Sequence, residues 1–212
     1  MVMGKEAGNR ECQVWLLGDS NPKNWASVLD VPLDPRHPAR HSIWTPILDV
    51  VQDAVFRQRR MRLDTSSLYV RNAVENPEGK PRPTEIDWGA DLAQAVEQLG
   101  RAMQHHRPKI LFSFGAFSYE FARRAVCEMP RRQFSHWGAR RLGQEFRRRV
   151  NAFDPESMNL LPLLHVSIAR GRFIHAHEYF CDQEGANYFD FVGTRVADRL
   201  IEHHDKLRVW VD

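Results

Sequence analysis

Four short apolar runs along the chain each end in polar residues. They are CQVWLLGD (12–19), SSLYVRNAV (66–74), PKILFSFG (108–115) and MNLLPLLHVS (158–167). Each run is shorter than a typical helix and is followed by residues that favour turns or loops, so each predicts a buried strand that opens into a polar loop.

Longer segments with apolar residues at helical spacing separate these runs. Helices are expected in 45–58, 87–106, 116–129 and 185–204. The proline-rich stretch 24–44 predicts mostly loop. Strands that alternate with helices predict an α/β fold, with a three-layer αβα arrangement around a central, mainly parallel four-stranded sheet.

Composition indicates one globular domain over residues 1–212, because the chain has 212 residues and is 42% hydrophobic. The formal net charge is only +3, but residues 131–149 contain seven Arg and one Glu. Such a stretch suits contacts with nucleic-acid phosphates, and it equally suits a solvated helix face. The sequence alone leaves both interpretations open.

Cysteine usage and the N-terminus place further bounds. Cys12, Cys127 and Cys181 are far apart and form no CxxC pair, so no disulfide framework is predicted. The N-terminal residues are polar, and no apolar run approaches the roughly 20 residues of a membrane helix. We expect a monomer in the cytoplasm. The pair His175 and His177 near Cys181 fits no standard zinc spacing, so no metal or other cofactor is expected.

The chemistry-bearing residues follow the predicted strands. Asp19 and Asn21 follow the first, Asn72 the second and His165 the fourth. In parallel sheets, ligands bind beyond the carboxyl ends of the strands, so these side chains are expected to meet in one crevice. The alternative interpretations are structural. Asp19 or Asn21 caps a turn, and His165 is a buried histidine with satisfied hydrogen bonds.

Four motifs in this order resemble the uracil-DNA glycosylase superfamily. LLGDSNPKN (16–24) resembles the family loop GQDPYH or GxNPG, and LYVRNAVEN (68–76) resembles its strand LLLNTVLT. LFSFGAFSYE (111–120) is similar to LLWGSHAQ, and LHVSIARGRFIHAHEYF (164–180) is similar to HPSPLS followed by RGFFGxxHF. The resemblance spans about residues 12–202. It implies that family's fold and an enzyme that flips a base out of DNA and hydrolyses its N-glycosidic bond.

The resemblance also implies roles for individual residues. Asn72 would read the edge of the flipped base, and His165 would stabilise negative charge on the departing base. Asp19 or Asn21 would orient the water that attacks C1′; the carboxylate favours Asp19, whereas spacing to the proline favours Asn21. Two sets of supporting contacts follow. The base pocket would include Lys23 and Ser20, and the DNA backbone would contact Ser20, Ser167, Arg170, Arg140 and Arg141.

Departures from the family pattern bear on the substrate. The family's first motif often has a Tyr whose ring blocks bases with a C5 substituent, and Lys23 stands at that position. HPS is replaced by HVS, and an arginine-rich insertion covers about residues 126–160. These changes resemble a branch that defends bacteria by excising glucosylated hydroxymethylcytosine from phage DNA. The alternatives are ordinary uracil excision and a non-catalytic DNA-binding module.

The resemblance further implies a monofunctional enzyme. A Schiff-base step needs a lysine in the site, and Lys23 is the one lysine that falls in a pocket motif. Iron–sulfur branches of the superfamily use four Cys, whereas this chain has three scattered ones.

Overall fold

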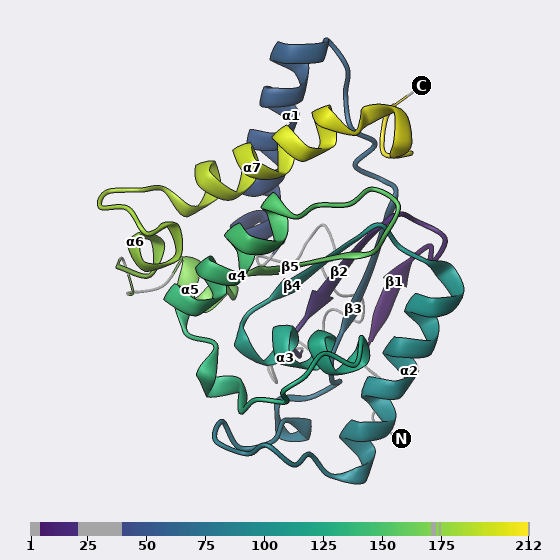
Figure 1. The fold of residues 1–212 in the computed structure, drawn as a ribbon, viewed down its shortest axis with the longest axis vertical. Coiled ribbons are helices and arrows are strands. Elements are labelled where there is room, and N and C mark those ends of the chain that lie inside the picture. The colour runs from purple at the N-terminus through teal and green to yellow at the C-terminus, as the bar shows by residue number, and fades with distance from the viewer. Residues whose placement is uncertain (1–4, 21–39, 171–172, 174, 212) are drawn as a thin grey trace.

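The computed structural model describes residues 5–20, 40–170, 173 and 175–211 (Figure 1). Five strands form one mixed sheet in the order β1-β3-β2-β4-β5. Their bounds are β1 Glu6–Gly8, β2 Val14–Gly18, β3 Leu68–Asn72, β4 Ile110–Phe114 and β5 Asn159–Leu163. The four predicted strands run parallel to one another, which confirms the α/β class and the mainly parallel sheet.

The fifth strand is absent from the sequence prediction. Strand β1 is three residues long and pairs antiparallel with β3, with Glu6 opposite Arg71 and Gly8 opposite Tyr69. It lies at the edge of the sheet, where one neighbour and much solvent suit a short polar strand. An apolar-run criterion does not detect such a strand.

Seven α-helices occur in the described part of the chain. They are α1 Thr45–Arg59, α2 Ala90–His106, α3 Ala116–Ala125, α4 Ala139–Asn151, α5 Val166–Ala169, α6 His175–Cys181 and α7 Tyr188–Glu202. A π-helix, η1 Arg40–Trp44, precedes α1, and short 3₁₀ turns are η2 Pro77–Gly79, η3 Phe134–His136 and η4 His204–Lys206. None of the helices in these ranges is long and apolar enough to cross a lipid bilayer.

The helices cover both faces of the sheet. Helices α1 and α7 pack on each other on one face, and α2 and α3 pack on each other on the opposite face (Figure 1). Helix α4 packs against β5 and α6. The arrangement is compatible with the predicted three-layer αβα architecture.

The central strand β2 is buried on both sides: Trp15, Leu16 and Leu17 have no exposed surface. Continuous apolar burial of this kind is typical of a parallel strand between two helix layers. Pro162 lies in β5, which is the other edge strand, so its missing N–H removes no internal ladder bond.

The order of the strands creates a topological switch point at the carboxyl edge of the sheet. The chain passes from β2 through α1 to β3 on one side, and from β3 through α2 to β4 on the other side of β2. The loops that leave β2 and β4 therefore run to opposite faces. Ligands bind at such a switch point in open α/β sheets.

Candidate functional site

Asn72 and Gly18 lie side by side at the carboxyl ends of β3 and β2. A Cβ atom built on Gly18 would lie 2.3 Å from Oδ1 of Asn72, so only glycine leaves room for this amide. Parallel pairing continues beyond the strands, because the N–H of Ala73 donates to the carbonyl of Gly18 at 2.9 Å. Asn72 is 6% exposed. Packing thus fixes the amide beside the first polar loop.

Asp19 follows Gly18 and forms an ion pair with Lys80. The Lys80 ammonium donates to Oδ2 of Asp19 at 3.2 Å and lies 3.1 Å from Oδ1. Oδ1 is buried and accepts no well-aligned hydrogen bond from any described residue. The backbone carbonyl of Asp19 accepts from the N–H of Val74 at 3.2 Å. The ion pair therefore holds the carboxylate beside the carboxyl end of β2, and Oδ1 has no aligned donor among the described residues.

His165 caps the N-terminus of α5 and has a defined tautomer. Its Nδ1 accepts the backbone N–H of Ser167 at 3.3 Å and lies 2.8 Å from the Ser167 hydroxyl. A backbone N–H can only donate, so Nδ1 carries no hydrogen in the neutral ring. This pairing assigns the proton of the neutral ring to Nε2, which becomes a hydrogen-bond donor.

The environment of His165 favours the neutral ring. Burial lowers the pKa of His165, and so does the positive charge of Lys80, whereas the negative charge of Asp19 raises it. The net result is a pKa below the usual 6.5. Gly115, which follows β4, has φ +95, and a Cβ there would lie 2.9 Å from the Cβ of His165. Glycine at this position allows both the left-handed turn and the close approach of the imidazole.

These residues form one group, which we call the carboxyl-edge site: Asp19, Asn72, Lys80 and His165. Asp19 lies on the loop after β2, Asn72 ends β3, Lys80 lies on the loop between β3 and α2, and His165 is the N-cap of α5. The site combines a carboxylate, an amide, an ammonium and a neutral imidazole donor. Ser20 is half-buried next to Asp19. Asn21 and Lys23 lie outside the described residues.

Sequence reasoning did not include Lys80 in the site. The signal was present, because Lys80 lies in the polar loop that follows the strand carrying Asn72. The carboxyl-edge argument applied to that loop would have marked its basic residues as candidates.

Ser167 and Arg170 have protein partners on α5 and beyond. Ser167 is exposed and contacts His165 as described. Arg170 is exposed, donates from Nε to the carbonyl of Ser42 at 3.0 Å, and places its guanidinium 4.8 Å from the ring centre of Phe189. Both side chains remain at the surface.

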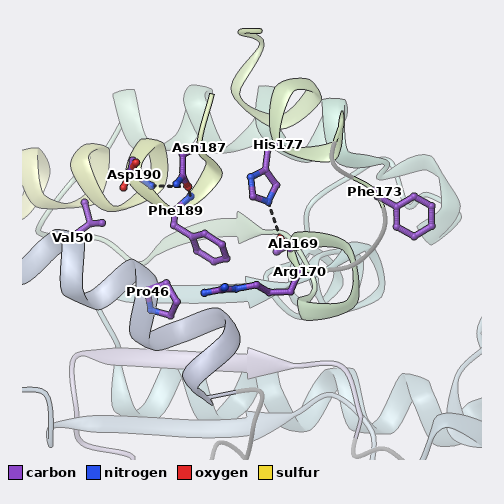
Figure 2. Close-up of a pocket in the computed structure, with 9 residues that line it drawn as sticks. All are labelled: Pro46, Val50, Ala169, Arg170, Phe173, His177, Asn187, Phe189 and Asp190. Carbon is purple, nitrogen blue, oxygen red and sulfur yellow. Dashed lines mark hydrogen bonds between the residues drawn. The ribbon is translucent and has the colours of Figure 1, made fainter. Parts of the chain in front are cut away.

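Arg170 also lines a cavity of about 480 Å³ between α1, α5, α6 and α7 (Figure 2). In Figure 2 the guanidinium of Arg170 extends between Pro46 and Phe189. His177 closes one side and lies 2.7 Å from the carbonyl of Ala169, so Nε2 is its donor. The cavity lies next to α5, the helix that His165 caps.

Three of the seven arginines of the 131–149 stretch form ion pairs with carboxylates of the protein. Arg149 forms ion pairs with Glu128 and Glu145, and Arg148 pairs with Glu145. Arg147 lies 3.7 Å from Asp182. Much of the positive charge of α4 is therefore paired with carboxylates of the protein. The apolar positions of the helix, Leu142, Phe146 and Val150, are buried.

Arg140 and Arg141 differ from these three. Neither makes a salt bridge with any residue that the structure describes. Arg141 donates to the carbonyl of His136 at 3.0 Å, and the Arg140 guanidinium lies 5.1 Å from the ring centre of Tyr179. They line a cavity of about 420 Å³ at the start of α4, whose first turn has no acidic residue.

The cluster of His175, His177 and Cys181 does not converge on one point. His175 lies 3.1 Å from Glu178, His177 contacts the Ala169 carbonyl, and Cys181 is buried. Within the described ranges, no group of three or more His, Cys, Asp or Glu side chains is placed to hold a metal ion.

No protein-family model matches this chain, and no curated protein matches it either.

Proposed function

We propose that this protein is a DNA glycosylase that flips a pyrimidine nucleotide out of DNA and hydrolyses its N-glycosidic bond. The observation that carries the proposal is the carboxyl-edge site, which gathers Asp19, Asn72 and His165 from three separate segments. These are the residues to which the motif resemblance assigns the attack on C1′, base recognition and stabilisation of the leaving base. The switch-point crevice is where an α/β sheet of this order binds a ligand.

Each group suits its proposed task. Asn72 offers both a donor and an acceptor to a base edge, and packing against Gly18 fixes its orientation. Nε2–H of the neutral His165 ring is a hydrogen-bond donor that would stabilise the negative charge that grows on the departing base. The carboxylate of Asp19 would orient the attacking water or stabilise the positive charge that develops at the sugar.

The proposed base is a C5-modified pyrimidine such as glucosylated hydroxymethylcytosine. The support is the sequence departure at Lys23, where the family's blocking Tyr ring is missing. Base release from DNA duplexes tests it, with uracil, a thymine mispair, 5-hydroxymethylcytosine or its glucosylated form as the target, read by mass spectrometry of the free base. We expect release of the glucosylated base. Release of uracil alone would assign the protein to ordinary repair, and DNA binding without release would favour the binding-module alternative.

Substitution of Asp19 tests the assignment of the site. Asp19→Asn keeps the size of the side chain and removes the carboxylate, so we expect base release to fall by about 10²–10⁴-fold. DNA affinity should remain close to that of the wild type. Asn21→Ala decides between the two loop candidates.

Asp53→Asn is the matched control for Asp19→Asn. Asp53 is an exposed carboxylate on α1 that also pairs with a basic residue, Arg57. Its loss should leave the rate of base release unchanged. An Asp19→Asn variant that releases base as fast as this control would exclude Asp19 from the reaction.

A further inference from the structure

Lys80 brings a primary amine to the carboxylate that the proposed mechanism places beside C1′. Its Nζ lies 3.1 Å from Oδ1 and 3.2 Å from Oδ2 of Asp19. A nucleophile that Asp19 activates would stand at hydrogen-bond distance from this carboxylate. The Lys80 amine already occupies a position of that kind, and its side chain is 27% exposed, so a nucleotide in the crevice has access to it.

We propose that Lys80 is a second nucleophile, and that the protein cleaves the DNA strand at abasic sites through a Schiff base on this lysine. The inference rests on the proposed function, because that function places C1′ of the flipped nucleotide at Asp19. It goes beyond hydrolysis of the glycosidic bond, since it adds a lyase step and a covalent protein–DNA intermediate. The substrate class is the ring-opened abasic deoxyribose.

The proposed reaction needs no oxidant or reductant. The Lys80 ammonium has no lone pair, so it first gives one proton to Asp19. The amine attacks the C1′ aldehyde carbon; the C=O oxygen leaves as water with one proton from the amine nitrogen and one from Asp19, and a protonated C=N bond forms. The freed carboxylate then takes a proton from C2′; the C–H electrons form a C2′–C3′ double bond, and the 3′-phosphate leaves with the C3′–O electrons. Water hydrolyses the imine and restores the amine.

The alternative is a structural role for Lys80, as an ion-pair partner that holds Asp19 in place. Lys80→Arg separates the two roles. A guanidinium keeps the positive charge and still pairs with a carboxylate, but it stays protonated and forms no Schiff base. A purely structural lysine would tolerate this substitution, whereas a nucleophile would not.

The experiment uses the full chain and a DNA duplex that contains one abasic site prepared in advance, so it does not require base release. Sodium borohydride reduces any imine to a stable amine, and denaturing gels then detect the covalent protein–DNA adduct. We expect the wild type to form the adduct and peptide mapping to place it on Lys80. Lys80→Arg should lower the adduct yield at least tenfold.

Lys109→Arg is the matched control, since Lys109 lies beside the amino end of β4 and donates to the carbonyl of Glu156. It should trap as well as the wild type. Absence of an adduct, or an adduct that persists at wild-type yield in Lys80→Arg, would overturn the inference. Base release from modified DNA is measured separately. A protein that releases the base and forms no adduct retains the proposed function and loses this lyase step.

Discussion

Two charge-rich regions of this molecule use their charges in opposite ways. Between α3 and α4, acidic and basic side chains pair with one another, and we call this group the α3–α4 network: Glu120, Arg123, Arg124, Glu128, Glu145 and Arg149. The carboxyl-edge site contains one ion pair and places it next to a neutral imidazole and an amide. In the first region the charges pair with one another within the protein, whereas the second region combines one ion pair with an imidazole and an amide.

The α3–α4 network shows that arginines of this chain can serve internal ion pairs. Glu120 is fully buried and accepts hydrogen bonds from Arg123 at 2.8 Å, from Arg124 at 3.0 Å and from the indole of Trp137 at 2.8 Å. Glu128 accepts from Nε of Arg123 at 3.0 Å and from one terminal nitrogen of Arg149 at 2.8 Å. These contacts anchor the segment after α3 to the helix layer, so these arginines are structural.

The largest expected effect is therefore on stability, at Glu120. Glu120→Ala leaves the guanidinium groups of Arg123 and Arg124 buried without their carboxylate, and we expect a loss of about 3–5 kcal/mol in the free energy of unfolding. Urea denaturation measures it. Glu97→Ala is the control, because its pair with Arg101 is exposed and should contribute less than about 1 kcal/mol. Equal losses in the two variants would contradict a structural role for the network.

The two regions also differ in how well the sequence predicts them. Apolar runs such as that at Trp15–Leu17 predict the parallel strands, since burial between two helix layers leaves a continuous signal. The partners of the arginines are not predictable in this way. Glu120 lies on α3 and contacts Arg132, and Glu128 lies on the segment after α3 and contacts Arg149. Only the packing of α3 against the following chain brings these pairs together.

Some residues of the carboxyl-edge site were predictable from the sequence and one was not. Asp19, Asn72 and His165 were predicted because each follows an apolar strand, and parallel strands bring their carboxyl ends to one edge. Lys80 was missed because a loop with its own 3₁₀ turn carries it back to Asp19. The tautomer of His165 was also beyond the sequence, since it depends on the N-cap geometry of a four-residue helix.

A smaller effect is expected on DNA affinity, at Arg140 and Arg141. Both face the cavity at the start of α4, and neither has an internal carboxylate among the described residues. The double variant Arg140→Glu, Arg141→Glu should weaken DNA binding, and the slope of log affinity against log salt should become shallower by about 2, one for each lost phosphate contact. Fluorescence anisotropy at several salt concentrations measures both quantities.

Arg148→Glu is the control for that double variant. It changes the net charge in the same direction, but Arg148 already pairs with Glu145 at 2.7 Å. It should leave the salt slope nearly unchanged. If both variants alter the slope equally per charge, then general electrostatics rather than a local contact governs DNA binding on this face.

The smallest expected effect is on the pKa of His165, and it probes the ion pair of the carboxyl-edge site directly. Lys80→Met removes a positive charge and should raise the pKa of His165, whereas Asp19→Asn removes a negative charge and should lower it further. NMR titration of the imidazole protons measures both. Opposite signs are the essential result. Shifts of the same sign would mean that altered burial, and not the two charges, dominates.

His136 supplies the internal control, because burial and the charges of Arg141 and Arg132 lower its pKa in the other region. Lys80→Met should leave the pKa of His136 unchanged, and Arg141→Met should raise it.

The lowered pKa of His165 also has a consequence for stability. A folded-state pKa below 6.5 means that the unfolded chain binds the proton more readily, so this stabilising contribution is complete above pH 6.5 and is lost as the pH falls below it. His165→Gln should remove that part of the pH dependence, because glutamine does not titrate.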